Sequence, residues 1–164
     1  MLRSMLAIPL FFFTTLLAVQ AQPPDSLLVG TIVVGNIVTL NYSETDLQCA
    51  LESVIGSGGV ISTVGIEPFG SGWALIGNGM LGSSGLDVSY RLVQHGQQLF
   101  LKMAAMWDKC EGVQCSSCKV LLDPEGDGYC DCKKKVVPSG YCNHSTGTGG
   151  GMSGLIGAIL NCAS

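Results

Sequence analysis

Eight cysteines constrain this chain of 164 residues more than any other feature of its sequence. Cys49 and Cys162 stand apart, and the other six are clustered: Cys110, Cys115, Cys118, Cys130, Cys132 and Cys142. An even number of cysteines in a small exported domain is typical of a disulfide framework. We therefore predict that all eight are paired. Six cysteines allow 15 connectivities, and the closely spaced Cys130 and Cys132 are expected to bind different partners.

Residues 1–21 predict that the chain enters such an oxidising compartment. Arg3 is followed by a short apolar run, and the small residues around Ala21 suit cleavage by a signal peptidase. A transmembrane helix needs about 20 apolar residues, and this run is shorter and contains Pro9. We expect a cleaved signal peptide, a secreted, periplasmic or cell-surface location, and no membrane segment in the mature chain.

Residues 22–106 predict a small α+β domain. Two apolar runs flank Gly35-Asn36, which suits a two-residue hairpin turn. Ser43 can cap a helix that ends near Gly56, and strands are expected over residues 60–69, 72–78, 86–94 and 98–103. In the third of these, Leu86 to Leu92 alternate between apolar and polar residues, which predicts one buried face. The expected fold is a small antiparallel sheet covered by one helix.

A helical wheel predicts one of the disulfides. With Leu47 at 0°, Cys49 falls near 200°, whereas the apolar positions fall between about −60° and +80°: Ala50, Leu51, Val54 and Ile55. Cys49 therefore faces away from the sheet, and its partner must approach from outside. Residues 146–164 are expected to form a Gly-rich hinge and an apolar tail that ends near Cys162, so we predict a Cys49–Cys162 bridge. Pairing between chains is the alternative.

Residues 107–145 are expected to form a disulfide-rich subdomain made of loops, because turn residues separate the cysteines. Three other uses of these cysteines remain open. Cys115-x2-Cys118, Cys130-x-Cys132 and Cys142-Asn-His144 could supply zinc ligands, although only one pair has the usual spacing. Cys110-x4-Cys115-x2-Cys118 also matches the start of a ferredoxin cluster motif. Thiol–disulfide exchange at Cys115-x2-Cys118 would need a lowered thiol pKa at a helix N-terminus. We expect no metal and no cofactor.

Other motifs give weaker indications. Asp123-x-Glu125-x-Asp127-Gly128 resembles the start of a calcium-binding loop, but Lys134 stands where a bidentate glutamate is required. Neither His95 nor His144 has a recognisable catalytic partner in the sequence, so we assign no catalytic residue. Asn41-Tyr-Ser43 and Asn143-His-Ser145 are glycosylation sequons. The formal charge of −4, with only scattered basic residues, argues against nucleic-acid binding.

The cysteine spacing resembles that of certain short exported proteins of Bacteroidota-type bacteria. The resemblance covers residues 36–145 and rests on Cys-x4-Cys-x2-Cys, Cys-x-Cys and Cys-Asn-His-Ser. It implies export and assigns no function, and the Gly-rich tail that ends in Cys162 departs from it.

These observations favour an exported, disulfide-stabilised and non-enzymatic module that binds a protein or surface component or serves a structural role. A zinc-binding or thiol-redox protein is the first alternative. A small secreted hydrolase is the second, and it would need a cleft that brings His95 or His144 next to carboxylates.

Overall fold

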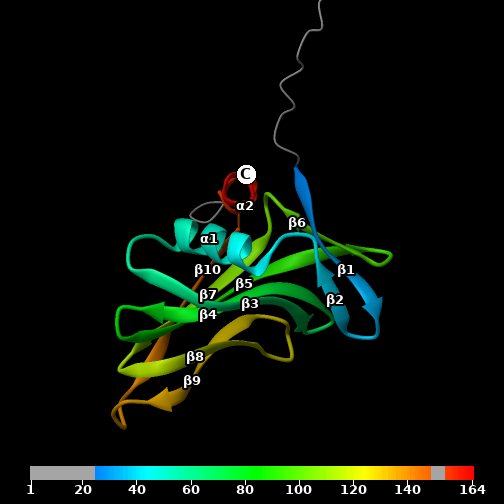
Figure 1. Cartoon of the computed structure of the whole chain (residues 1–164). Coiled ribbons are helices and arrows are strands. Elements are labelled where there is room, and N and C mark those ends of the chain that lie inside the picture. The colour runs from blue at the N-terminus through cyan, green and yellow to red at the C-terminus, as the bar shows by residue number, and fades with distance from the viewer. Residues whose placement is uncertain (1–24, 149–153) are drawn as a thin grey trace, which may run out of the picture.

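The computed structural model describes residues 25–148 and 154–164 (Figure 1). The predicted signal peptide at residues 1–21 lies outside the described residues, as does part of the predicted hinge with Met152. No helix in the described ranges is long and apolar enough to span a bilayer.

The first three elements form as the sequence predicts. Strands β1 (Ser26–Val34) and β2 (Ile37–Leu40) pair antiparallel around the Gly35-Asn36 turn, where Gly35 has a φ of 56°. Helix α1 (Glu44–Ile55) begins with a capping box. In it the Ser43 hydroxyl accepts a hydrogen bond from the Asp46 N–H, and the Asp46 carboxylate accepts one from the Ser43 N–H.

The central strands follow in a meander. They are β3 (Gly59–Phe69), β4 (Gly72–Leu81), β5 (Ser84–His95) and β6 (Gln98–Lys102). Strand β5 is long enough to have several partners. It pairs with β4 along one edge, while its other edge is divided between β7 over Leu86–Tyr90 and β6 over Val93–His95. This division lets the sheet branch and curl at β5.

The prediction of a small sheet covered by one helix and followed by loops is wrong. The cysteine-rich segment forms four strands, β7 (Met106–Val113), β8 (Cys115–Leu122), β9 (Gly128–Lys135) and β10 (Tyr141–Thr148). Strands β7 and β10 extend the main sheet, whose order is β10-β7-β5-β6-β1-β2 with β4 and β3 branching from β5. The described residues are therefore mostly β, with a strongly curved eight-stranded antiparallel sheet and two helices rather than one (Figure 1).

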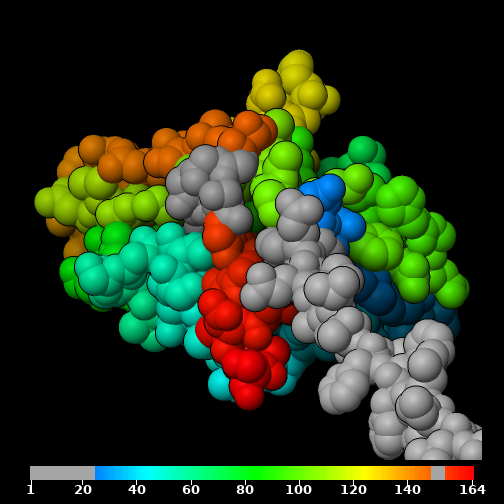
Figure 2. All heavy atoms as spheres, turned by 90° about the horizontal axis from the view of Figure 1, so that it is seen from above, coloured from blue at the N-terminus to red at the C-terminus, as the bar shows by residue number. Residues whose placement is uncertain are grey.

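Both helices close the inner face of this sheet. Leu47, Ala50 and Leu51 of α1 are fully buried against the strands. Helix α2 (Leu155–Cys162) packs on α1 and buries Leu155, Ile156 and Ile159 in the same core. Figure 2 shows α2 in red beside the cyan α1. The predicted Cys49–Cys162 disulfide joins the two helices.

The outer face of β5 is buried as well, which the alternation of its residues did not predict. Asp87 and Ser89 were expected to face solvent. Instead, the β8–β9 hairpin forms a separate two-stranded sheet that covers this face. The close approach of β8 to β5 depends on a glycine, because a Cβ atom on Gly85 would lie 2.7 Å from the backbone of Ser116 and Ser117. The molecule thus has two layers around β5, an apolar core inside and a polar, cystine-rich layer outside.

Candidate functional site

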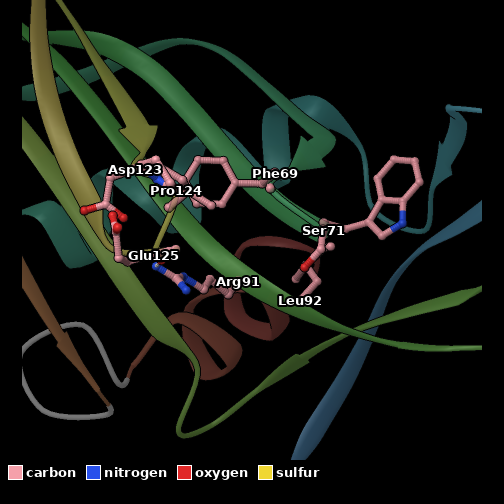
Figure 3. Close-up of a pocket in the computed structure, with 12 residues that line it drawn as sticks. Phe69, Ser71, Arg91, Leu92, Asp123, Pro124 and Glu125 are labelled. Atoms are coloured by element: carbon pink, nitrogen blue, oxygen red, sulfur yellow. Dashed lines mark hydrogen bonds between the residues drawn. The ribbon is translucent and has the colours of Figure 1, made fainter.

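A groove lies where the β8–β9 hairpin meets the turn between β3 and β4. Two hollows of about 390 and 320 Å³ form it, and both are lined by Phe69, Gly70, Leu122 and Asp123. The larger hollow also reaches Arg91, Glu125 and Trp73, and the smaller one reaches Glu67 and Lys119. Volumes of this size are usual for small-molecule sites. We call these residues the hairpin groove (Figure 3).

The β8–β9 loop forms one wall of the groove, and its own hydrogen bonds hold it in shape. The Asp127 N–H donates to the Asp123 carboxylate at 2.8 Å, and the Asp123 N–H donates to the Asp127 carbonyl at 3.0 Å. Gly126 closes the turn with a φ of 91°, a conformation that favours glycine. The acidic residues at this turn are therefore part of a tight loop.

Arg91 connects this wall to the sheet. Its Nη2 donates to the Gly126 carbonyl at 2.9 Å, and its guanidinium lies 6.0 Å from the centre of the Phe69 ring. The same Nη2 lies 3.8 Å from Oδ2 of Asp108. Arg91 is 32% exposed and borders the groove. One side chain thus positions the loop and contacts the aromatic ring.

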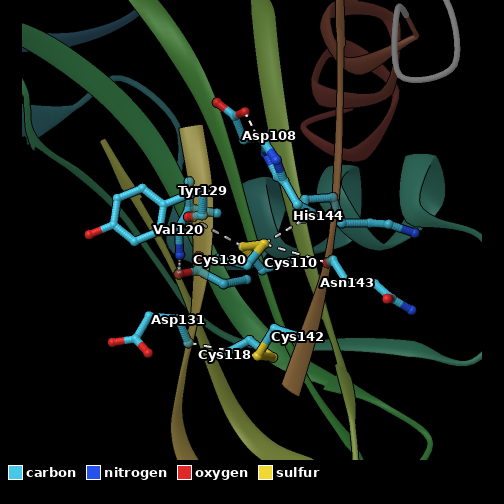
Figure 4. Close-up of a disulfide and its surroundings, with 12 residues drawn as sticks. Asp108, Cys110, Cys118, Val120, Tyr129, Cys130, Asp131, Cys142, Asn143 and His144 are labelled. Carbon is cyan, nitrogen blue, oxygen red and sulfur yellow. Dashed lines mark hydrogen bonds and ion pairs between the residues drawn. A yellow bond between two sulfur atoms is a disulfide. The ribbon is translucent and has the colours of Figure 1, made fainter. Parts of the chain in front are cut away.

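Asp108 is the buried centre of this polar layer. It is 1% exposed, and its Oδ1 accepts a hydrogen bond from Nε2 of His144 at 2.9 Å (Figure 4). The Asp108–His144 pair links β7 to β10, and Arg91 links both to the loop. Gly128 of β9 packs directly on this carboxylate, since a Cβ there would lie 2.6 Å from Cγ of Asp108. The network fixes the hairpin against the sheet.

Asp87 makes a second connection on the same face. Its Oδ2 accepts a hydrogen bond from the Val120 N–H at 2.8 Å, and its Oδ1 has no hydrogen-bond partner among the described residues. Burial raises the pKa of Asp87 from 3.8 to about 6, although the Val120 N–H partly opposes this shift. On the inner face, burial also raises the pKa of Tyr90.

The groove offers an apolar surface next to hydrogen-bond acceptors. Phe69, Leu92, Leu122 and Pro124 provide the apolar part. Asp123 and Glu125 provide carboxylates, and neither has a cationic side chain within ion-pair distance among the described residues. Figure 3 shows Phe69 and Pro124 together, with the Arg91 guanidinium and the Glu125 carboxylate near them. Such a surface suits a ligand that carries both an apolar face and hydrogen-bond donors.

The structure pairs every cysteine that the sequence singled out. Besides Cys49–Cys162, the disulfides are Cys110–Cys130, Cys115–Cys132 and Cys118–Cys142. Cys130 and Cys132 do have different partners, as expected. The sulfurs of Cys115, Cys132 and Cys142 lie within 4.8 Å of one another, but each is held in a disulfide and is not a thiolate.

The histidines do not lie in the groove, as a hydrolase would require, and the acidic motif does not form a calcium site. Neither histidine is among the described residues that line the groove: His144 contacts Asp108, and His95 packs edge-on against Phe100 at a hairpin end. Within the described ranges, the carboxylates of the calcium-like motif do not converge into a ligand cluster. The predicted sequon residues Asn41 and Asn143 are both exposed, and their glycosylation stays a prediction.

Sequence reasoning missed Phe69 and Arg91. The sequence did contain one weak indication of Arg91. It follows Asp87 and Ser89 on one face of β5, and buried polar side chains at such positions need a hydrogen-bonding or ionic partner.

No family model, curated protein or solved structure matches this chain.

Proposed function

We propose that this chain is an exported, non-enzymatic binding module whose ligand occupies the hairpin groove. The observation that carries the proposal is the juxtaposition of Phe69 with the Asp123 and Glu125 carboxylates in a hollow of about 390 Å³. Four disulfides support export, because such bonds persist in oxidising compartments. Two of them, Cys110–Cys130 and Cys118–Cys142, tie the hairpin that forms one wall of the groove to β7 and β10, which lowers the entropic cost of binding.

The ligand is a small molecule rich in hydrogen-bond donors with one apolar face, and saccharides are the class that combines these features. A C–H face would stack on the Phe69 ring, and hydroxyl groups would donate to the carboxylates of Asp123 and Glu125. Both carboxylates can accept several hydrogen bonds each. No nucleophile and base are needed for this role.

A panel of soluble mono- and oligosaccharides tests the proposal by NMR chemical-shift perturbation on the mature, oxidised protein. Binding should shift signals from Phe69, Arg91 and the 123–126 loop. Replacing Phe69 by Ala or Glu125 by Gln should weaken binding about fivefold or more, because either change removes a contact worth about 1 kcal/mol or more. The matched control is Tyr141→Ala, which alters an exposed aromatic residue on β10 outside the groove. Saccharide binding that is unchanged in Phe69→Ala, or shifts confined to another surface, would contradict the proposal.

A further inference from the structure

The two disulfides at the far end of the β8–β9 hairpin are in contact with each other. Sγ of Cys142 lies 3.4 Å from Sγ of Cys115, although each is bonded to another cysteine. Sγ of Cys132 lies within 4.8 Å of both. Thiol–disulfide exchange requires a thiolate to reach a disulfide sulfur. The Cys142 sulfur already lies close enough to the Cys115–Cys132 bond for such an attack once its own bond is broken. Cys118 and the third disulfide of this layer, Cys110–Cys130, lie outside this group of three sulfurs, and Cys118 is connected to it through its bond to Cys142.

A second pairing of the same four cysteines is compatible with the strand register. Cys118 of β8 and Cys132 of β9 are direct antiparallel partners. Directly opposite residues have Cα atoms about 4.5–5.5 Å apart, which a disulfide can bridge. If Cys118 bonds to Cys132, then Cys115 and Cys142 are the remaining neighbours, and they are the pair already in contact. Both pairings therefore fit one backbone.

The accessibility of the sulfurs and the local charge identify where a thiol would attack. Cys115 and Cys118 are buried, whereas Cys132 and Cys142 are partly exposed. Exposed lysines at 133, 134 and 135 follow Cys132 directly, and Lys135 is the strand partner of Cys115. Cationic side chains favour thiolates and attract anionic thiols. The lysine run thus directly follows Cys132, one of the two partly exposed cysteines, although Nζ of Lys133 is paired with the Asp131 carboxylate.

We propose that Cys142 is a thiol–disulfide exchange site that is attacked by an anionic low-molecular-weight thiol. The incoming thiolate bonds to Cys142, breaks Cys118–Cys142 and leaves Cys118 as a thiolate. Cys118 then attacks Cys132, which breaks Cys115–Cys132 and forms Cys118–Cys132. The released Cys115 thiolate attacks the mixed disulfide at Cys142, forms Cys115–Cys142 and returns the thiol. No net oxidation or reduction occurs, so the cluster isomerises and the thiol acts as a catalyst.

Exchange changes how the hairpin is attached. In the present pairing, β10 is tied to Cys118 in the body of β8, and after exchange it is tied to Cys115, where β8 begins. Figure 4 shows the Cys118–Cys142 bond between β8 and β10. Because the same hairpin forms a wall of the hairpin groove, exchange changes the restraint on that wall.

A single variant tests the exchange without an added thiol. Cys118→Ser leaves Cys142 unpaired at 3.4 Å from Cys115. We expect Cys142 to capture Cys115 and release Cys132, so that iodoacetamide under native conditions labels both Cys142 and Cys132. Trypsin places these two cysteines in different peptides, since lysines lie between them. The matched control is Cys110→Ser, which leaves Cys130 outside the exchange group, and its label should stay on Cys130. Label confined to Cys142 in Cys118→Ser would overturn the proposal.

The unaltered mature protein gives the second test. After incubation with reduced glutathione and acid quenching, disulfide mapping by fragmentation mass spectrometry should detect glutathione on Cys142. It should also detect Cys115–Cys142 and Cys118–Cys132 in equal yield, with one free protein thiol gained for each glutathione bound and none beyond that. If only the original links and fully reduced cysteines are found, the cluster does not exchange and serves only as a structural crosslink. Saccharide binding is measured separately, so failure of this test leaves the proposed function standing.

Discussion

A buried carboxylate on the central strand makes the stability of this protein depend on pH. The side chain of Asp87 is 1% exposed, and burial raises its pKa from 3.8 to about 6. The folded state therefore holds the proton more tightly than the unfolded chain does. The contribution of Asp87 to the free energy of unfolding is highest below the unfolded pKa of 3.8, falls as the pH rises from about 4 to about 6, and stays reduced above that range.

Asp87→Asn should remove this dependence. The Asn side-chain oxygen can still accept the Val120 N–H, and no charge is buried. At about pH 7.5 we expect the variant to be more stable than the original protein by up to about 3 kcal/mol, and near pH 3.5 we expect no gain. Urea denaturation at both pH values measures the difference. Ser89→Ala, a neutral change on the same buried face, should have equal effects at the two pH values. A gain from Asp87→Asn that is the same at both would contradict the assignment.

At the scale of elements, the sequence predicted well where local chemistry decides the structure. The Gly35-Asn36 turn, the Ser43–Asp46 cap and the alternation in β5 are all set by neighbouring residues, and these elements lie where expected. Strands β7 to β10 could not be predicted in this way. Their cysteine, lysine, serine and glycine residues have weak local preference for strands, and distant pairing partners stabilise them, as Ser89 opposite Asp108 illustrates.

The candidate groove was only partly predictable for the same reason. The turn at Asp123–Gly128 can be identified from its sequence, and it does form the loop between β8 and β9. Phe69 and Arg91 lie on strands that are far from this loop in sequence, and only packing of the hairpin on the sheet brings them together. Glycine residues within the strands could have indicated this packing, because a glycine inside a strand often marks a place where another segment of backbone approaches closely.

Gly85→Ala should loosen the hairpin from the sheet. A Cβ at this position meets the Ser116–Ser117 backbone, which cannot move without shifting β8. We expect a loss of about 1–3 kcal/mol, the usual cost of overpacking, measured as a lower urea midpoint. Gly65→Ala is the matched control, because it also lies within a strand but has open space around its Cβ. Equal losses in the two variants would show that the close contact between β5 and β8 has little energetic weight.

At the scale of the whole molecule, the Cys49–Cys162 bond connects the last element of the chain to its first helix. The two cysteines are 113 residues apart, whereas Cys115 and Cys132 are only 17 apart. A crosslink restricts the unfolded chain more when the loop it closes is longer. In the chain-entropy model, the two bonds stabilise the fold by about 5 and about 3 kcal/mol. The long-range bond should therefore contribute more.

Replacing both cysteines of each pair by serine tests this order. We expect Cys49→Ser/Cys162→Ser to lower the free energy of unfolding more than Cys115→Ser/Cys132→Ser does, as measured by urea denaturation under non-reducing conditions.

Helix α2 should stay docked in the Cys49→Ser/Cys162→Ser variant, because Leu155, Ile156 and Ile159 are still buried in the core. Hydrogen exchange separates the two effects, since amides in α2 should exchange faster while those in β5 follow global unfolding. If α2 amides exchange freely in the variant, the bond itself, and not apolar packing, holds the helix. A smaller loss of stability for the long-range pair would contradict the entropic argument.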